Sequence, residues 1–401
     1  MRRNIILLIM LFTVGVLSAQ MTVSGLLDTT VSAAVLAGDE PELFCGFEQY
    51  ANIRFQSRLR ERGIVYGAVN LIAASGSSAL PLVLAGVNPI GDNFITAIEL
   101  ERLYFRLNGE HTDLDCGLFR LPFGYGQVWG PSDFLNPKNP LKPDARPRAI
   151  LGAALNWYPN DDFKIIGFSA AGRDPFSYNS EGWLLGLAGD QHWNKLSLQA
   201  LYSYEMPKKG NDSMKPLRPG DFARFEIPED PDPVIGSKFG IHRAGLSLKA
   251  DFEAGFVIEA LYTYNHEIET ELDGLSFSAG IDYSLFDGDI IVMAEYLYNG
   301  ETSSTAYGFG GNFLNNHYLY AGFTYILGDF TNMSLAVIYG FDDVSFTPII
   351  SVNHELFQGA TLTFTAQVPM DRDLFFNDGN RGELGPSFSY FNCSARIRLR
   401  F

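Results

Sequence analysis

Apolar and polar positions alternate along many segments of this chain. In residues 275–285, apolar side chains occupy the odd positions, and serine, glycine or aspartate occupies the even ones. The same alternation runs through residues 361–368 and 392–401. A period of two places successive side chains on opposite faces of a strand and cannot form one face of a helix. The pattern therefore predicts strands with one dry face and one wet face.

About eighteen such segments follow one another, and the breaks between them alternate between short and long. The short breaks are 61–63, 108–113, 158–162, 193–195, 252–255, 286–289, 327–330 and 357–359. The long ones are 76–93, 123–147, 207–237, 301–316 and 370–386, with shorter members near 37–43, 172–181, 266–274 and 341–345. Strict alternation puts the tight turns at one end and the loops at the other, and it gives an even strand number. The sequence therefore predicts an all-β fold, a transmembrane antiparallel up-and-down β-barrel of about 18 strands, with about 16 as the alternative count.

Aromatic residues gather at both ends of the expected strands. Three strands end alike, in "LYSY" (201–204), "LYTY" (261–264) and "EYLY" (295–298). Beside the tight turns lie Trp157, Trp193, Phe252, Phe286, Phe330 and Phe357. Two aromatic bands are typical of a protein that crosses two water–lipid boundaries, whereas a soluble β-sandwich needs none.

The first residues read as a secretory signal peptide spanning residues 1–19. Arg2 and Arg3 precede an apolar core over 5–17, and the small residues Ser18 and Ala19 follow it. An uncleaved anchor helix is the alternative. No later apolar run approaches the roughly 20 residues that a transmembrane helix needs. We therefore expect residues 20–401 to form one transmembrane β-barrel in the bacterial outer membrane, with outer-membrane lipid around it.

Net charge and cysteine count narrow the possible partners. Removal of Arg2 and Arg3 takes the formal charge from −17 to −19, which argues against nucleic acid as a partner. The three cysteines are an odd number, and their spacing indicates neither a disulfide framework nor a metal site. We expect them to be small apolar fillers, and we expect no cofactor.

The interior of such a barrel is wide. Strands about 4.7 Å apart close into a cylinder of roughly 35 Å, which side chains alone cannot fill. The proline-rich third loop, residues 123–147, also carries Trp129, and a stiff loop with aromatics is expected to pack against a wall. Folded inward, it would narrow the lumen and expose Asp133, Lys138, Lys142, Asp144, Arg146 and Arg148 to the pore. The alternative is an external lid of purely structural use.

Strand parity then assigns a charged wall to the lumen. The inward positions of the second, fourth and last strands include Arg54, Arg58, Arg102, Arg106, Arg396 and Arg398. Because the first and last strands pair when a barrel closes, these arginines should form one basic sector. Glu259, Asp282 and Glu295 should face it across the lumen, giving a transverse field that favours polar or charged solutes. The alternative is that the charges only pair and hydrate the wall. Keeping both Glu101 and Arg102 inside requires a β-bulge at this point.

The chain ends in "RIRLRF", an alternation that resembles the terminal β-signal of Gram-negative outer-membrane proteins. The resemblance implies that Ile397, Leu399 and Phe401 are read by the barrel-assembly machinery. The third loop follows "LFRLPFG" and resembles the constriction loop of general and substrate-specific porins. Eight residues, "GLFRLPFG" (117–124), resemble a strand end of phosphate-selective porins. The porin resemblance implies a water-filled channel, and a homotrimer is one assembly that it suggests.

The function expected is passive diffusion of small hydrophilic solutes or ions through an outer-membrane porin. One alternative is a surface adhesin or structural barrel, in which the long loop 207–237 would carry the function. Another is a barrel hydrolase, which needs a base positioned beside a nucleophile or a coupled acid pair. The six histidines are scattered, and neither a Ser–His pair nor a carboxylate pair is visible, so we expect no enzyme.

Overall fold

The computed structural model describes residues 21–36, 42–59, 62–79, 94–138, 140–141, 147, 149–171, 182–207, 240–264, 274–300, 315–372, 384–385 and 389–401. The predicted signal peptide lies outside this range. The described residues form eighteen strands and one 3-10 turn, η1 (Phe286–Gly288). The strands are β1 (Met21–Leu36), β2 (Glu42–Leu59), β3 (Gly63–Gly76), β4 (Phe94–Asn108), β5 (Thr112–Phe119), β6 (Ile150–Asn160), β7 (Phe163–Ala170), β8 (Leu184–Trp193), β9 (Leu196–Glu205), β10 (Ile241–Asp251), β11 (Ala254–Tyr264), β12 (Leu275–Leu285), β13 (Ile290–Asn299), β14 (His317–Ile326), β15 (Thr331–Gly340), β16 (Ser345–Phe357), β17 (Ala360–Gln367) and β18 (Ser389–Arg400).

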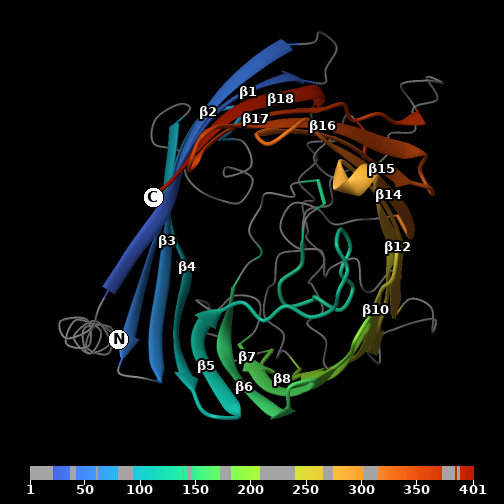
Figure 1. Ribbon diagram of the computed structural model, residues 1–401. Helices are drawn as coiled ribbons and strands as arrows, with labels where there is room; N and C mark the ends of the chain where they lie inside the picture. The colour runs from blue at the N-terminus through green and yellow to red at the C-terminus, as the bar shows by residue number, and fades with distance from the viewer. Residues whose placement is uncertain are drawn as a thin grey trace, which may run out of the picture.

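The strands form one closed ring. Each pairs antiparallel with its neighbours in sequence, and β1 pairs with both β2 and β18 (Figure 1). The closing register runs from Leu26 opposite Arg400 to Leu36 opposite Ser389. The predicted up-and-down barrel is confirmed, with 18 strands rather than 16.

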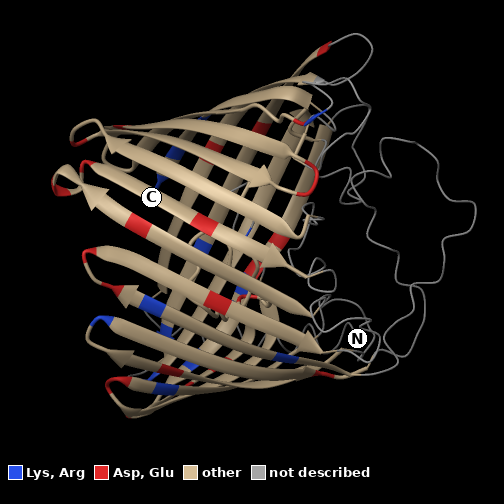
Figure 2. Cartoon of the chain, turned by 90° about the vertical axis from the view of Figure 1, so that its right-hand side faces the viewer, with Lys and Arg blue, Asp and Glu red and all other residues tan. Residues whose placement is uncertain are grey.

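The tight turns lie at one end of the ring, where their coloured charges are visible in Figure 2. Two to four residues separate each even-numbered strand from β2 to β16 from the strand that follows it. The long connections follow the odd-numbered strands, and the connection between β5 and β6 is one of the longest. The alternation of short and long breaks is therefore confirmed.

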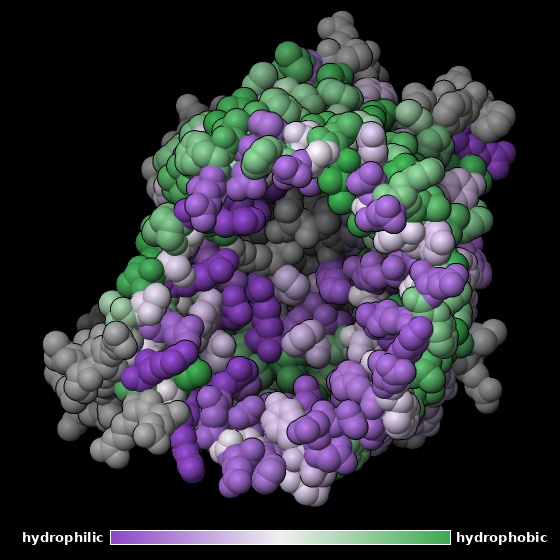
Figure 3. Space-filling view, viewed as in Figure 1, coloured by the Kyte–Doolittle hydropathy of each residue, from purple (hydrophilic) through white to green (hydrophobic). Residues whose placement is uncertain are grey.

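The two faces of the wall differ as the period of two requires. On β12 the outward Ile281 and Tyr283 are exposed, whereas the inward Ser276 and Ser278 are buried. Hydrophilic residues line the hollow of the ring and hydrophobic residues cover much of its outer rim (Figure 3). Within the described residues, no helix has the length and apolar character needed to cross a membrane.

The aromatic bands have the expected places. His242 lies between Tyr204 and Tyr264 on three adjacent strands, with ring centroids 4.8 and 6.3 Å away. At the other rim, the large side chains beside the tight turns are exposed: Trp157, Trp193, Phe252, Phe286, Phe330 and Phe357. Rings therefore line both edges of the outward apolar surface.

The predicted bulge is present in β4. Ala68 pairs with Arg102 and the next residue, Val69, pairs with Leu100, so Glu101 is the extra residue. Glu101 is buried and accepts a hydrogen bond from the inward Asn52 at 2.5 Å. The bulge thus keeps Glu101 and Arg102 on the same side of the wall.

Candidate functional site

The chain between β5 and β6 enters the ring. Residues 120–138, called the inward loop here, leave β5 and lie inside the circle of strands, where Figure 1 draws them in teal. Arg120 at the start of the loop bonds to Glu101 on β4, and the residues that follow it pack mainly against the inner faces of β7 to β16.

Six consecutive backbone N–H groups of the inward loop bond to side chains of the wall. Gly124 donates to Gln199 Oε1 on β9 at 2.6 Å. Tyr125 and Gly126 donate to Glu259 Oε1 on β11, the latter at 2.5 Å. Gln127, Val128 and Trp129 donate to the carboxylate of Glu295 on β13, at 3.2, 3.0 and 2.9 Å. The backbone therefore crosses β9 to β13, bonding to every second strand.

Neither carboxylate faces open water. Glu259 is 0% exposed and Glu295 is 3% exposed, because the inward loop lies over both. The expectation that they face the arginines across a wet gap is therefore wrong for these two residues. A hydrogen bond contributes roughly 0.5–1.5 kcal/mol net, and more where its acceptor is ionised, so the bonds to these two carboxyl groups together hold the loop firmly.

Side chains of the inward loop add further links to the wall. The Tyr125 hydroxyl donates to Asp190 Oδ1 at 2.5 Å, and Gln127 Nε2 donates to Asp282 Oδ2 at 2.9 Å. Lys138 Nζ donates to the carbonyl of Gly126 at 2.7 Å. Lys138 therefore ties one part of the loop to another.

Asp133 was expected at the pore surface but is only 3% exposed. Its Oδ1 accepts the backbone N–H of Phe123 at 3.2 Å. Burial raises the pKa of Asp133 to about 7. Asp133 therefore braces the inward loop from within.

Apolar packing fixes the loop at two places. Phe123 and Leu121 pack among inward side chains of β7 to β11, including Phe168, and Phe123 and Phe168 have ring centroids 5.0 Å apart. Trp129, which is fully buried, packs against Tyr318 with a centroid distance of 5.6 Å. Burial of one such side chain contributes about 1.5–3 kcal/mol. The apolar inner surface of β7 to β16 is thus a seat for the loop.

The opposite wall carries the arginines, and several of them are paired. Arg398 makes two hydrogen bonds to Asp28, at 2.8 and 2.7 Å, across the seam between β18 and β1. Arg106 holds Asp115 in the same two-bond manner, at 2.6 and 2.7 Å. Two-bond pairs of this kind fix both side chains in the wall.

The remaining arginines have polar or aromatic neighbours. Arg54 donates to Asn52 at 2.6 Å, and Arg102 lies over the Tyr66 ring at 4.8 Å. Arg120, a residue that parity left unassigned, donates to Glu101 at 2.8 Å. Arg58 and Arg396 also belong to this inner wall, on β2 and β18.

The arginines of β18, β2 and β4 therefore lie in one region of the ring, because β1 pairs with both β18 and β2, and β3 lies between β2 and β4. Their role as a basic sector of the pore stays a prediction. The acidic partners Asp28 and Asp115 were not foreseen, although both lie at inward positions of their strands. Lys142, Asp144, Arg146 and Arg148 lie outside the described residues, so their predicted place in the pore remains a prediction.

One group of side chains was not predicted from the sequence, because its members meet only when β8 and β9 pair across a tight turn. Ser197 Oγ lies 2.8 Å from His192 Nδ1, and His192 Nε2 lies 3.5 Å from Asp190 Oδ1. All three side chains are inward and flank the turn at 194–195. Contrary to the expectation from sequence, a serine, a histidine and a carboxylate do meet.

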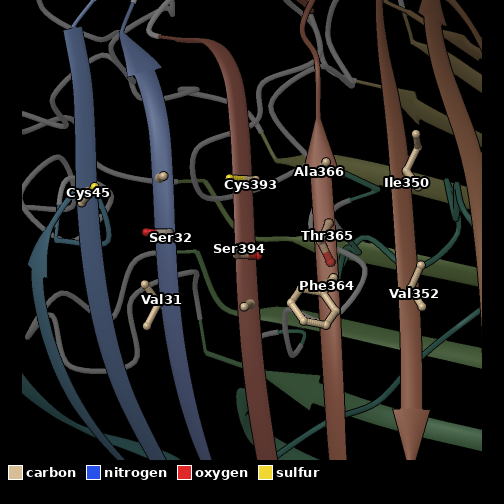
Figure 4. A pocket seen from close by; sticks show the side chains of 12 residues that line it. Val31, Ser32, Cys45, Ile350, Val352, Phe364, Thr365, Ala366, Cys393 and Ser394 are labelled. Atoms are coloured by element: carbon tan, nitrogen blue, oxygen red, sulfur yellow. The ribbon is translucent and has the colours of Figure 1, made fainter.

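A hollow of about 410 Å³ lies on the outward face of the barrel, where β16, β17, β18, β1 and β2 run side by side (Figure 4). Small side chains produce it: Ala33, Cys45, Ala366, Cys393 and Ala395. It lies outside the ring and is not part of a path through it.

The three cysteines are free thiols. Among the described residues, no group of three or more His, Cys, Asp or Glu side chains could hold a metal ion.

Comparison with known proteins finds the fold but no close relative. No family model matches the chain, and no curated protein matches its sequence. Among solved structures, it is similar to Pseudomonas aeruginosa OpdQ, with a TM-score of 0.58 and 10% identity over 96% of this chain and 98% of that one. It is also similar to Acinetobacter baumannii OccAB1, at 0.57 and 10% over 95% and 96% of the two chains.

The outer membrane protein OpdK of Pseudomonas aeruginosa aligns with a TM-score of 0.56 and 8% identity, over 95% of this chain and 98% of OpdK. The likeness therefore extends over nearly the whole of each chain. At such low identity it establishes the barrel fold and leaves the chemistry of the interior to the residues themselves.

Proposed function

We propose that the protein is an outer-membrane porin, through which small hydrophilic solutes or ions diffuse passively along a lumen narrowed by the inward loop. The observation that carries the proposal is the combination of an apolar outer surface, a polar hollow and a loop bound inside it. An apolar band flanked by aromatic rings suits a lipid bilayer, and a polar interior suits water. The likeness to OpdK, an outer membrane protein, supports the same setting.

The free path should lie between the inward loop and the wall from β18 to β4. The loop is fixed to β9 through β13, so the space left inside the ring is on the arginine side. Charged rings at a narrow point set the ion preference of a pore. Arg54 and Arg58 are therefore proposed to face the solute. The same is proposed for Lys142, Arg146 and Arg148, which the sequence predicts to lie in the pore.

Single-channel recording of the refolded protein in planar bilayers tests this function. We expect steady conductance steps, with a reversal potential that shifts toward cations when Arg54 and Arg58 are replaced by glutamine. A barrel that is folded, as shown by heat-modifiable mobility on a gel, yet conducts no ions would overturn the proposal. Trimer formation is a separate expectation, which cross-linking in detergent would measure.

The line Ser197–His192–Asp190 favours a barrel hydrolase as a second candidate. Asp190 could orient His192 so that Nδ1 accepts the serine proton. The group is poorly arranged for catalysis, because the His192 side chain is 52% exposed and Asp190 already accepts the Tyr125 hydroxyl. The hydrolase is therefore less well supported than the porin. Labelling by a fluorophosphonate probe that is lost in Ser197→Ala would support a hydrolase, and absence of labelling would leave the porin.

A further inference from the structure

The backbone of the inward loop is bonded to the wall along a continuous stretch. From Gly124 to Trp129, six successive N–H groups end on three wall side chains, Gln199, Glu259 and Glu295, which we call the docking track. The Ser132 N–H also points to Glu259, at 3.4 Å. Backbone recognition of this kind depends on the path of the loop more than on its side chains.

Two residues of the docking track, Glu259 and Glu295, are acidic, whereas the opposite side of the barrel wall carries the arginines. In the docked state the Glu259 and Glu295 carboxylates bond to N–H groups and are shielded from water. Without the inward loop, the same two carboxylates would face the lumen from β11 and β13, opposite Arg54 and Arg58. Exposed carboxylates on the wall of a water-filled pore attract cations.

We propose that the docking track makes ion preference depend on the position of the inward loop. Glu259 and Glu295 are positioning residues while the loop is docked, and they become pore-lining acids when it is not. The docked pore favours anions more strongly than the undocked pore. This inference rests on the proposed channel function.

Conductance and reversal potential, measured in four proteins, test the proposal. The first is the full protein, and the second has residues 124–141 replaced by a short Gly-Ser linker. The third and fourth are the same two proteins with Glu259→Gln and Glu295→Gln. We expect the shortened loop to raise conductance at least about two-fold and to shift the reversal potential toward cations. In the shortened protein the two glutamines should abolish that shift while leaving the conductance high.

The same substitutions should change ion preference far less in the full protein. There they should instead make the current noisier, because glutamine keeps one acceptor oxygen but presents an NH2 group where the other oxygen accepted. An equal shift in both backgrounds, or no cation shift in the shortened pore, would overturn the inference. Asp282→Asn is a control, since Asp282 lies on β12 between the two acidic track residues and its bond to the loop is exposed. It should alter ion preference in both backgrounds.

A second measurement does not depend on conduction. Ser132 and Ser247 have their hydroxyl oxygens 3.0 Å apart, one in the loop and one on β10. With the three native cysteines replaced by alanine, a Ser132→Cys, Ser247→Cys pair should form a disulfide readily. Formation should be slower when Glu259 and Glu295 are both glutamine, and an unchanged rate would show that the track does not hold the loop. If no variant conducts but this rate falls, the channel function fails while the docking role stands.

Discussion

Gly124 and Gly126 owe their identity to what a side chain would strike. Gly124 has a φ of +79°, and a Cβ there would collide with the Glu259 carboxylate. A Cβ on Gly126 would collide with the backbone carbonyl of Trp129. Gly124 therefore allows the backbone to approach the wall closely enough for its N–H groups to bond, and Gly126 allows the loop to fold back on itself at Trp129.

Replacing Gly124 by alanine should release the inward loop without unfolding the barrel. The strained φ alone costs about 1–3 kcal/mol, to which the clash with Glu259 adds. We expect larger and noisier current steps from a protein whose gel mobility still shows a folded barrel. Gly130→Ala is the matched control, because its Cβ would meet only the Asp133 Cβ, at 3.5 Å. Equal behaviour of the two variants would contradict this explanation.

Asp133 should make loop docking depend on pH. Its pKa is raised to about 7 by burial, so the docked loop holds the proton more tightly than the free loop does. The stabilisation is complete below about pH 4, the pKa of a free aspartate, and is lost as the pH rises through about 7. Current noise should therefore increase from pH 5 to pH 8.

Asp133→Asn should reduce this change, because asparagine is neutral and its oxygen can still accept the Phe123 N–H. Recording wild type and variant across the same pH range is the measurement. A wild-type pH dependence that persists unchanged in the variant would assign the titration to another group.

At the scale of the element, period two made the strands and turns predictable. Lipid on one side and water on the other impose a different requirement on alternate residues, and a tight turn interrupts it. The bulge at Glu101 was visible for the same reason, since two successive charged residues cannot both be inward on a regular strand. Such local rules act between neighbours in sequence.

The loop's seat was not predictable from these rules. In β7 the inward Ile166 and Phe168 lie among other apolar residues. In the sequence they stand at positions where the alternating pattern calls for polar residues. They are apolar because Phe123, some forty residues earlier, covers them. Apolar residues on both faces of a strand were the only signal of a covered interior.

The bulge gives an element-scale prediction. Deleting Glu101 would make the ladder between β3 and β4 regular and leave every other side chain of β4 on its present face. The variant should fold, as judged by heat-modifiable gel mobility. Deleting Leu103 instead would turn the residues on one side of the deletion to the wrong face. A folded Leu103 deletion or an unfolded Glu101 deletion would contradict the assigned register.

At the scale of the whole molecule, closure brings the two ends of the described chain together. Gly25 donates to the Phe401 carbonyl at 2.7 Å, and Phe401 donates back to Gly25 at 3.0 Å. Arg398 and Asp28 join the same two strands on the inner face. The outward Ile397, Leu399 and Phe401 are all exposed on the apolar side of this seam.

The terminal strand therefore has two proposed roles, which deletion of Phe401 separates. If the ending serves only to close the ring, its loss removes one antiparallel pair of hydrogen bonds and lowers stability both in detergent and in cells. If it is also read by the barrel-assembly machinery, refolding into detergent should be little changed while the yield of folded barrel in the outer membrane falls. We expect the second result, because the seam keeps eleven further residue pairs, from Leu26–Arg400 onward. Equal losses in detergent and in cells would reduce the ending to a closing strand.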